Sequence, residues 1–150
     1  EYQIIEAKSI GADAILLIAA VLSKQEISNF VQLAHSLSLE VVLELHDESE
    51  LEKCIDEVDV IGVNNRNLAT MKIDIEHSIH MSHLLPTGKI KISESGIESA
   101  ESISYLKNAG YSGFLIGSYF MRHALPHEAC KNLIQNLEKL NRNSQKSIVV

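Results

Sequence analysis

Five short apolar segments, each followed by a segment with helical periodicity, recur along this chain at intervals of roughly 25 residues. Such alternation is typical of a parallel sheet with helices packed outside it. We therefore predict a single α/β domain over residues 1–150, ending in a polar tail at 141–150. The apolar segments are residues 14–20, 41–45, 59–63, 89–93 and 113–116.

Helix-starting signals follow several of these segments. Ser23 and Glu26 have the spacing of a capping box, in which the side chain of each residue accepts a hydrogen bond from the backbone N–H of the other. Asp47 and Asp74 are residue types that favour the position before a helix. Pro126 is suited to the first turn of a last helix. These signals predict helices between successive strands.

Two architectures fit this pattern. A closed (β/α)8 barrel needs eight strands, so five strands with a leading helix at residues 1–10 make up a partial TIM barrel. The alternative is an open, doubly wound five-stranded sheet. Residues 14–20 are apolar at every position, and we expect a strand buried on both faces there.

Composition limits the possible partners and location. The formal net charge of −7 argues against nucleic acid and anionic membrane as partners, because both bind basic surfaces. The longest apolar run, residues 14–22, is too short to span a bilayer. Cys54 and Cys130 lack metal-type spacing, and we expect reduced thiols in a cytoplasmic protein.

Polar residues stand at the carboxyl ends of the predicted strands, where both architectures place the active site. Glu44 interrupts an apolar strand, and an unpaired carboxylate there would cost several kcal/mol. It is therefore either a structural ion-pair member or part of a polar site, and Glu94 allows the same two interpretations. Asn64 and Arg66 follow the third strand, where Arg66 could also be a solvated loop residue. Other strand-end residues are His46, Asp47, Asn65, Ser93 and Ser95.

Small residues follow the last two strands, where helices begin. Free backbone N–H groups and the helix dipole favour an anion at such places. Paired loops of this kind after the final strands of a barrel commonly bind phosphate. We predict a phosphate site formed by Gly96, Gly117 and Ser118, and hence a phosphorylated small-molecule substrate.

A metal site is not expected. His77, His80 and His83 recur at every third residue, but no carboxylate or cysteine completes a ligand set, and a solvated helix flank explains them. The sequence also lacks a G-x-S-x-G nucleophile motif, a P-loop and a G-x-G-x-x-G fingerprint.

Several motifs together resemble the indole-3-glycerol phosphate synthase family, over residues 1–137. The most specific are the run Asn-Asn-Arg-Asn-Leu within residues 61–68 and the run Ser-Glu-Ser-Gly-Ile within residues 92–97. Residues 11–18, 41–51 and 114–117 add to the likeness. The resemblance implies a (β/α)8 barrel whose strands four to eight are present here. It also implies ring closure of 1-(2-carboxyphenylamino)-1-deoxyribulose 5-phosphate with loss of carbon dioxide and water, without metal or organic cofactor.

The resemblance assigns roles to individual positions. Glu44 matches the family's catalytic glutamate, and Asn64 matches the asparagine that holds the substrate hydroxyls, with Arg66 beside it. Glu94 and Ser95 match a pair that lines the site. The remaining matches are to phosphate-binding positions: Gly96, Gly117 and Ser118.

The family's essential lysines lie on barrel strands one and three, which have no counterpart here. Lys89 and Lys91 stand at the start and interior of their strand and are poor substitutes. We therefore expect this chain to be inactive alone, and to self-associate or require an N-terminal segment. One alternative is a non-catalytic, self-associating partial barrel that retains phosphate binding. Another is a different phosphate-binding barrel such as phosphoribosylanthranilate isomerase, which uses an early strand-end cysteine, whereas Cys54 falls in a predicted helix.

Overall fold

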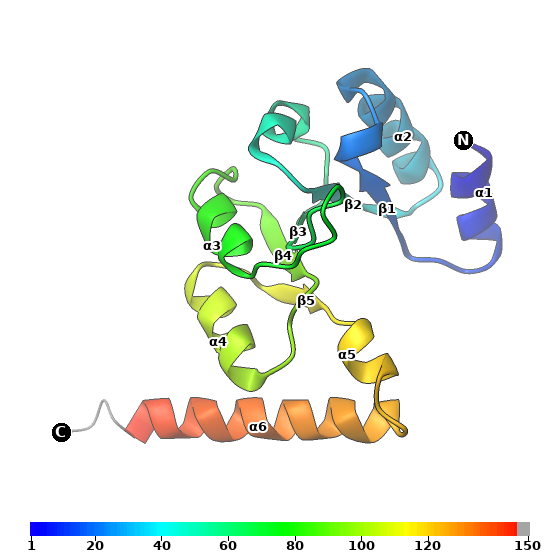
Figure 1. Cartoon of the computed structure of the whole chain (residues 1–150). Helices are drawn as coiled ribbons and strands as arrows, with labels where there is room; N and C mark the ends of the chain where they lie inside the picture. Colours follow the sequence, from blue (N-terminus) through cyan, green and yellow to red (C-terminus); the bar gives the residue numbers. More distant parts are fainter. Residues whose placement is uncertain (147–150) are drawn as a thin grey trace.

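The computed structural model describes residues 1–146, whose five strands form one parallel sheet (Figure 1). The strands lie in the sheet in the order in which they occur along the chain, so each crossover joins two neighbouring strands. The predicted α/β fold is confirmed. The strands are β1 (Ala14–Ile18), β2 (Glu40–Leu45), β3 (Val60–Asn64), β4 (Ile90–Glu94) and β5 (Gly113–Leu115).

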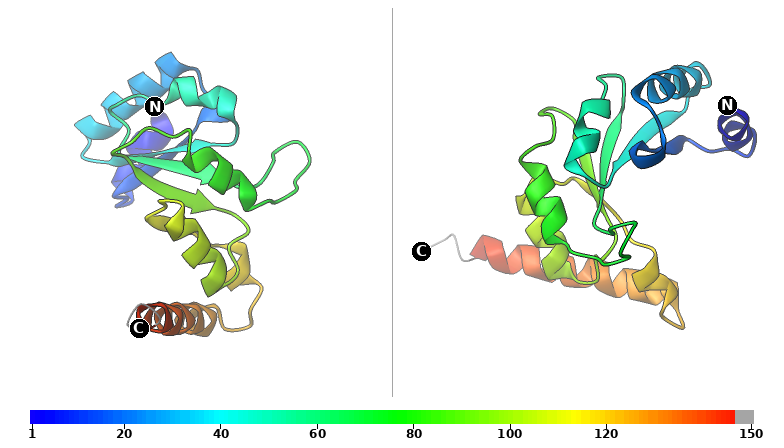
Figure 2. Two further views of the ribbon diagram at one scale, coloured as in Figure 1. Left: turned by 90° about the vertical axis from the view of Figure 1, so that its left-hand side faces the viewer. Right: turned by 45° about the horizontal axis from the view of Figure 1, so that its top comes forward.

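Helices connect the strands and lie outside the sheet, as the alternating pattern predicts (Figures 1 and 2). The last of them, α6, packs against α4 and α5. The α-helices are α1 (Tyr2–Ser9), α2 (Lys24–Ser36), α3 (Glu76–Ser82), α4 (Ala100–Asn108), α5 (Ser118–Met121) and α6 (Pro126–Lys146), and the 3₁₀-helices are η1 (Ala19–Val21) and η2 (Glu48–Lys53).

Local capping sets several helix starts. The backbone N–H of Ser23 donates to the Glu26 carboxylate at 2.8 Å, and the Ser23 hydroxyl accepts from the Glu26 N–H at 3.3 Å, which completes the predicted capping box. The Asp47 carboxylate caps η2 by accepting from the Ser49 N–H at 2.9 Å. Helix α6 continues through residues 141–146 of the predicted polar tail, because no glycine or proline interrupts it. Residues 147–150 of that tail lie outside the described residues.

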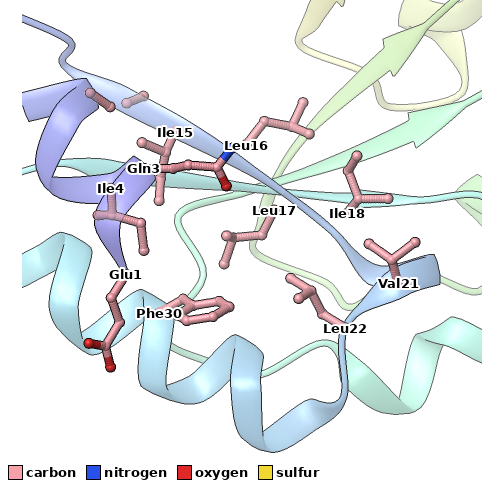
Figure 3. A pocket seen from close by; sticks show the side chains of 12 residues that line it. Glu1, Gln3, Ile4, Ile15, Leu16, Leu17, Ile18, Val21, Leu22 and Phe30 are labelled. Carbon is pink, nitrogen blue, oxygen red and sulfur yellow. The ribbon is translucent and has the colours of Figure 1, made fainter. Parts of the chain in front are cut away.

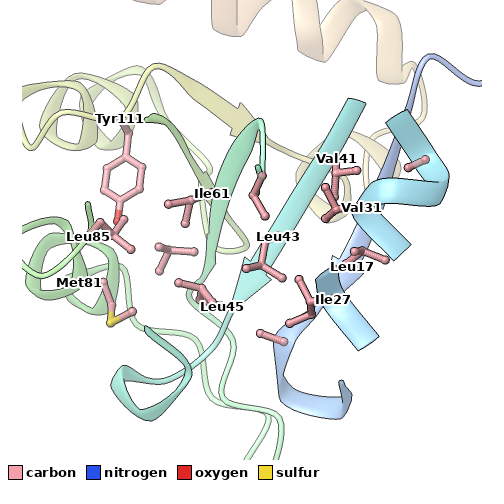
Figure 4. Close-up of a cluster of buried hydrophobic side chains, with 14 of the residues drawn as sticks. Leu17, Ile27, Val31, Val41, Leu43, Leu45, Ile61, Met81, Leu85 and Tyr111 are labelled. Atoms are coloured by element: carbon pink, nitrogen blue, oxygen red, sulfur yellow. The ribbon is translucent and has the colours of Figure 1, made fainter. Parts of the chain in front are cut away.

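The hydrophobic core fills the space between the sheet and the outer helices (Figure 4). Alternate side chains of β2, namely Val41, Leu43 and Leu45, are completely buried on this side. Ile27 and Val31 of α2 meet them there. Because side chains along a strand alternate between faces, the residues between them point to the opposite face of the sheet.

That opposite face is open, and it would be the inside of a closed barrel. The parallel register places Ile18 of β1 beside Glu44 of β2, and Glu44 beside Gly62 of β3. Leu16 and Ile18 are exposed on this face, and Leu115 of β5 is exposed as well. The expected burial of residues 14–20 on both faces is therefore wrong. Within residues 1–146 no further strand covers them, and the chain turns into η1 after Ile18.

Each outer strand of the sheet has a single strand neighbour among the described residues. A groove of about 510 Å³ runs along β1 between α1 and α2, and Figure 3 shows its largely apolar lining, which includes Leu16, Ile18 and Phe30. A second apolar groove of about 390 Å³ lies beside β5, lined by residues that include Phe114 and Leu133. Both sheet edges thus carry apolar surface next to unpaired backbone.

Candidate functional site

The carboxyl ends of β2, β3 and β4 bring three predicted site residues together. Asn64 and Glu94 are aligned on neighbouring strands, and the Asn64 side-chain amide donates to the Glu44 carboxylate at 3.2 Å. Glu44 and Glu94 are only 7% and 5% exposed. These three side chains lie near one another because the same-face positions of adjacent parallel strands are neighbours, and of the three Glu94 lines the cavity described below.

Gly62 allows the two glutamates to approach each other. It is the register partner of Glu44 on the strand between them, and a Cβ atom on Gly62 would collide with Oε1 of Glu94. The Glu94 carboxyl group therefore lies over the α-carbon of Gly62, on the side of Glu44. A glycine within an apolar strand often marks such a close approach, and that signal was available in the sequence.

Burial and the adjacent Glu44 carboxylate raise the pKa of Glu94 to about 8. Two carboxylates that share a buried site cannot both ionise cheaply, because each charge disfavours the other. At neutral pH, Glu94 is therefore mostly protonated. The pair combines a proton donor and a proton acceptor, which is the requirement for general acid–base chemistry.

His46 is a further member of this cluster. It follows Glu44 by two residues, and its Nε2 lies 3.1 Å from Oε1 of Glu44. The side chain is 7% exposed, and neither ring nitrogen has a hydrogen-bond partner of good geometry. The sequence places His46 at a strand end, but only the structure shows that its ring is buried against the carboxylate.

A cavity of about 390 Å³ adjoins Glu94. Arg66 lines it from the loop after β3, while Ser95, Gly117 and Ser118 line it from the loops after β4 and β5. An arginine and the first backbone N–H groups of α5 make this cavity suited to an anion. Gly96, the remaining predicted phosphate residue, is not part of the lining, and its α-carbon faces Ile73.

Asn65 has a structural role despite its place at the end of β3. Its side-chain amide donates to the Ser93 hydroxyl at 3.1 Å and to the Ser95 carbonyl at 3.0 Å, and its carbonyl accepts from the Ser78 N–H at 3.0 Å. This buried network joins α3 to the end of β4. It also fixes the loop from which Ser95 enters the cavity.

Lys89, just before β4, and Lys91, within it, are directed away from the carboxylates. Lys89 Nζ donates to the Val58 carbonyl at 2.9 Å, and Lys91 Nζ donates to the Ser82 carbonyl at 3.3 Å. Within residues 1–146, no lysine forms an ion pair with Glu44 or Glu94. The carboxylate pair therefore has no cationic partner from a lysine in this part of the chain.

Metal-binding clusters and membrane-spanning helices are absent from the described part of the chain. There, no group of three or more His, Cys, Asp or Glu side chains is placed to hold a metal ion. Instead, His80 pairs with Glu48 at 2.6 Å, and burial lowers the pKa of His77. No helix of residues 1–146 combines the length and apolar character needed to cross a bilayer.

Solved structures that resemble this chain support the interpretation of its sheet as part of a barrel. The chain superposes on 3-hexulose-6-phosphate synthase from Salmonella typhimurium with a TM-score of 0.74 at 17% identity, covering 92% of this chain and 67% of that one. A chain of the tryptophan synthase complex from Pyrococcus furiosus gives a TM-score of 0.65 at 15% identity, covering 91% and 59%. These likenesses concern the fold alone, which is a partial (β/α)8 barrel.

Sequence comparisons identify the family. Indole-3-glycerol phosphate synthase from Bacteroides thetaiotaomicron is 43% identical over 138 residues, which are 92% of this chain and 53% of that protein. The enzyme of the same name from Campylobacter fetus is 44% identical over 133 residues, covering 88% and 52%. The chain thus spans about half the length of these relatives. The family model for indole-3-glycerol phosphate synthase matches residues 1–133, and the chain belongs to this family.

Proposed function

We propose that this chain supplies the carboxylate-bearing and phosphate-binding part of an indole-3-glycerol phosphate synthase. The substrate would be 1-(2-carboxyphenylamino)-1-deoxyribulose 5-phosphate, and the reaction would close the indole ring with loss of carbon dioxide and water. The observation that carries the proposal is the position of the Glu44–Glu94 pair beside the cavity lined by Arg66, Gly117 and Ser118. That arrangement puts acid–base groups next to an anion-binding surface.

The residue types fit the steps of this reaction. Ring closure requires a proton for the ketone oxygen, and dehydration requires both an acid and a base. Glu44 is the proposed base and Glu94 the proposed acid, while Asn64 both orients Glu44 and holds substrate hydroxyls. Arg66, Gly117 and Ser118 are the proposed phosphate ligands, with Ser95 at the cavity wall. Gly96 shapes the loop after β4 through its positive φ of 75°, and its backbone N–H is a further proposed phosphate donor.

The family's reaction also uses lysines near the reacting centre, and within residues 1–146 no lysine forms an ion pair with either carboxylate. We propose that the isolated chain is catalytically incomplete and acts with an N-terminal segment that brings further strands to the β1 edge. The free thiols of Cys54 and Cys130 agree with a cytoplasmic location, where thiols stay reduced.

The test is turnover of the phosphorylated substrate by the 150-residue chain, alone and with a separately supplied N-terminal segment. The proposal predicts turnover only in the second case. A second candidate function is a non-catalytic, self-associating partial barrel, which the apolar grooves at both sheet edges favour. Phosphate binding without turnover in the presence of the segment would support that candidate.

A further inference from the structure

The imidazole of His46 is buried beside the Glu44 carboxylate. Its ring nitrogens are inaccessible and lack hydrogen-bond partners of good geometry, while Oε1 of Glu44 lies 3.1 Å from Nε2. A buried polar group without a partner is costly, so a small rotation that forms a bond from Nε2–H to Glu44 is strongly favoured. Such a bond needs the proton of the neutral ring to be on Nε2.

Hydrogen-bond donors are distributed unequally over the two glutamates. Glu44 faces His46 at Oε1 and receives the Asn64 amide at Oε2. In contrast, Oε1 of Glu94 is buried without any hydrogen-bond partner. Donors stabilise the ionised form of a carboxyl group, whereas a carboxyl group without donors is better accommodated when protonated. The surroundings therefore distinguish two otherwise similar side chains.

We infer that His46 is a positioning residue that donates to Glu44, keeps Glu44 ionised and so leaves the proton of the pair on Glu94. This inference rests on the proposed function, in which Glu44 is the base and Glu94 the acid. His46 acts through Glu44, with no contact to substrate required. Without His46, the proton could reside on either glutamate, and the roles of acid and base would be mixed.

Other titratable groups near His46 do not replace it. His77 of α3 is close enough to interact electrostatically with His46 and with Asp47, and burial lowers the pKa of His77. Asp47 itself accepts from the Ser49 N–H, which lowers its pKa. Among residues 1–146, His46 is the one histidine within ion-pair distance of Glu44.

The test uses the 150-residue chain with ¹³C-labelled glutamate carboxyl groups, observed by NMR at pH 7. In the unaltered chain, the Glu94 signal should have the position of a protonated carboxyl and the Glu44 signal that of an ionised one. His46→Leu removes the donor and keeps apolar bulk, and the protonated fraction of Glu44 should rise at least about tenfold. His46→Gln restores a donor and should return both signals toward those of the unaltered chain.

His80→Leu is the matched control, because His80 is an exposed histidine of α3 paired with Glu48, away from the two glutamates. It should leave both carboxyl signals unchanged. A folded His46→Leu chain with an unchanged Glu44 signal would overturn the inference. So would a Glu94 signal that is ionised at pH 7 in the unaltered chain.

A second measurement requires no substitution. The ring ¹⁵N signals of His46 in the unaltered chain should show the proton on Nε2, and a proton on Nδ1 alone would contradict the inference even if His46→Leu did not fold. Neither measurement depends on substrate or turnover. Failure of the proposed function would thus appear as absent turnover even with the N-terminal segment, while the NMR signals behave as predicted. Failure of the His46 inference would appear as contradictory NMR signals, whatever the turnover of the mixture.

Discussion

The carboxyl group of Glu94 occupies the space that a side chain at Gly62 would need, one strand away from Glu44. This relationship explains how residues on β2 and β4 meet although β3 separates them. The acid–base pair therefore depends on a residue that has no side chain. Gly62 is therefore part of the site because it provides space for the Glu94 carboxyl group, although it has no chemical role.

Gly62→Ala should separate the two glutamates. The new methyl group would push Glu94 away from Glu44 and toward solvent, and its pKa should fall by at least about one pH unit. Carboxyl ¹³C titration measures this shift. Gly117→Ala is the comparison, because a Cβ there would have no atom within 4 Å and should leave the Glu94 titration unchanged. An unaltered Glu94 pKa in a folded Gly62→Ala chain would contradict the geometry.

Glu94 should make stability depend on pH in a defined direction. Its pKa is raised from 4.5 to about 8, so the folded chain holds a proton that the unfolded chain has released between these values. The free energy of unfolding should then fall as pH rises through this window, by roughly 1.4 kcal/mol per pH unit from this group. Below about pH 4.5 the contribution is fully present, since both states are protonated.

Urea unfolding at several pH values measures this effect. Glu94→Gln removes the titrating group and should flatten the dependence between these two pKa values relative to the unaltered chain. Glu98→Gln is the control, because Glu98 forms an exposed ion pair with Arg122 at 2.6 Å outside the cluster. If Glu94→Gln kept the slope of the unaltered chain, the pH dependence of stability would not come from a raised pKa of Glu94.

The cavity beside Glu94 should bind inorganic phosphate. Arg66→Ala removes the positive charge of the cavity, and Gly117→Leu fills the cavity with a side chain. Either change should weaken phosphate binding by about tenfold or more. Amide NMR shifts during a phosphate titration give the dissociation constant. Arg122→Ala removes an arginine that lies outside the lining and should have little effect. Equal affinities in all these variants would mean that phosphate binds elsewhere.

The open edge at β1 should drive self-association of the isolated chain, since an unpaired apolar strand is a template for pairing. Leu16→Glu places a charge in the groove along β1 and should shift the mass measured by sedimentation toward the 16.6 kDa of one chain. Leu84→Glu changes a similarly exposed leucine away from this edge and should not. A monomeric unaltered chain at high concentration would rule out this role for the edge.

Much of this architecture could be predicted from local signals. The strand–helix alternation predicts the parallel sheet, and the capping box at Ser23 predicts the start of α2. Polar interruptions of apolar strands predict the convergence of Glu44 and Glu94, because parallel strands end at the same edge. These features depend on short-range sequence and on the geometry common to all parallel sheets.

Other features depend on tertiary contacts that no local pattern specifies. The position of the Glu94 side chain over Gly62 depends on how three neighbouring strands are aligned with one another. The burial of His46 and the turning of Gly96 toward Ile73 depend on how loops pack. The exposure of Leu16 depends on which strands are present beside β1, which the apolar sequence of that strand does not reveal.

We propose that residues 1–146 hold the carboxylates and phosphate site of the synthase but none of its catalytic lysines. The most direct test measures indole-3-glycerol phosphate formation by the 150-residue chain, with and without a separate N-terminal segment taken from the Bacteroides thetaiotaomicron relative. We expect no turnover by the chain alone and turnover by the mixture, reduced by about 10²-fold or more when Glu44→Gln is used. Robust turnover by the 150-residue chain alone, or by a mixture that contains Glu44→Gln, would contradict this proposal.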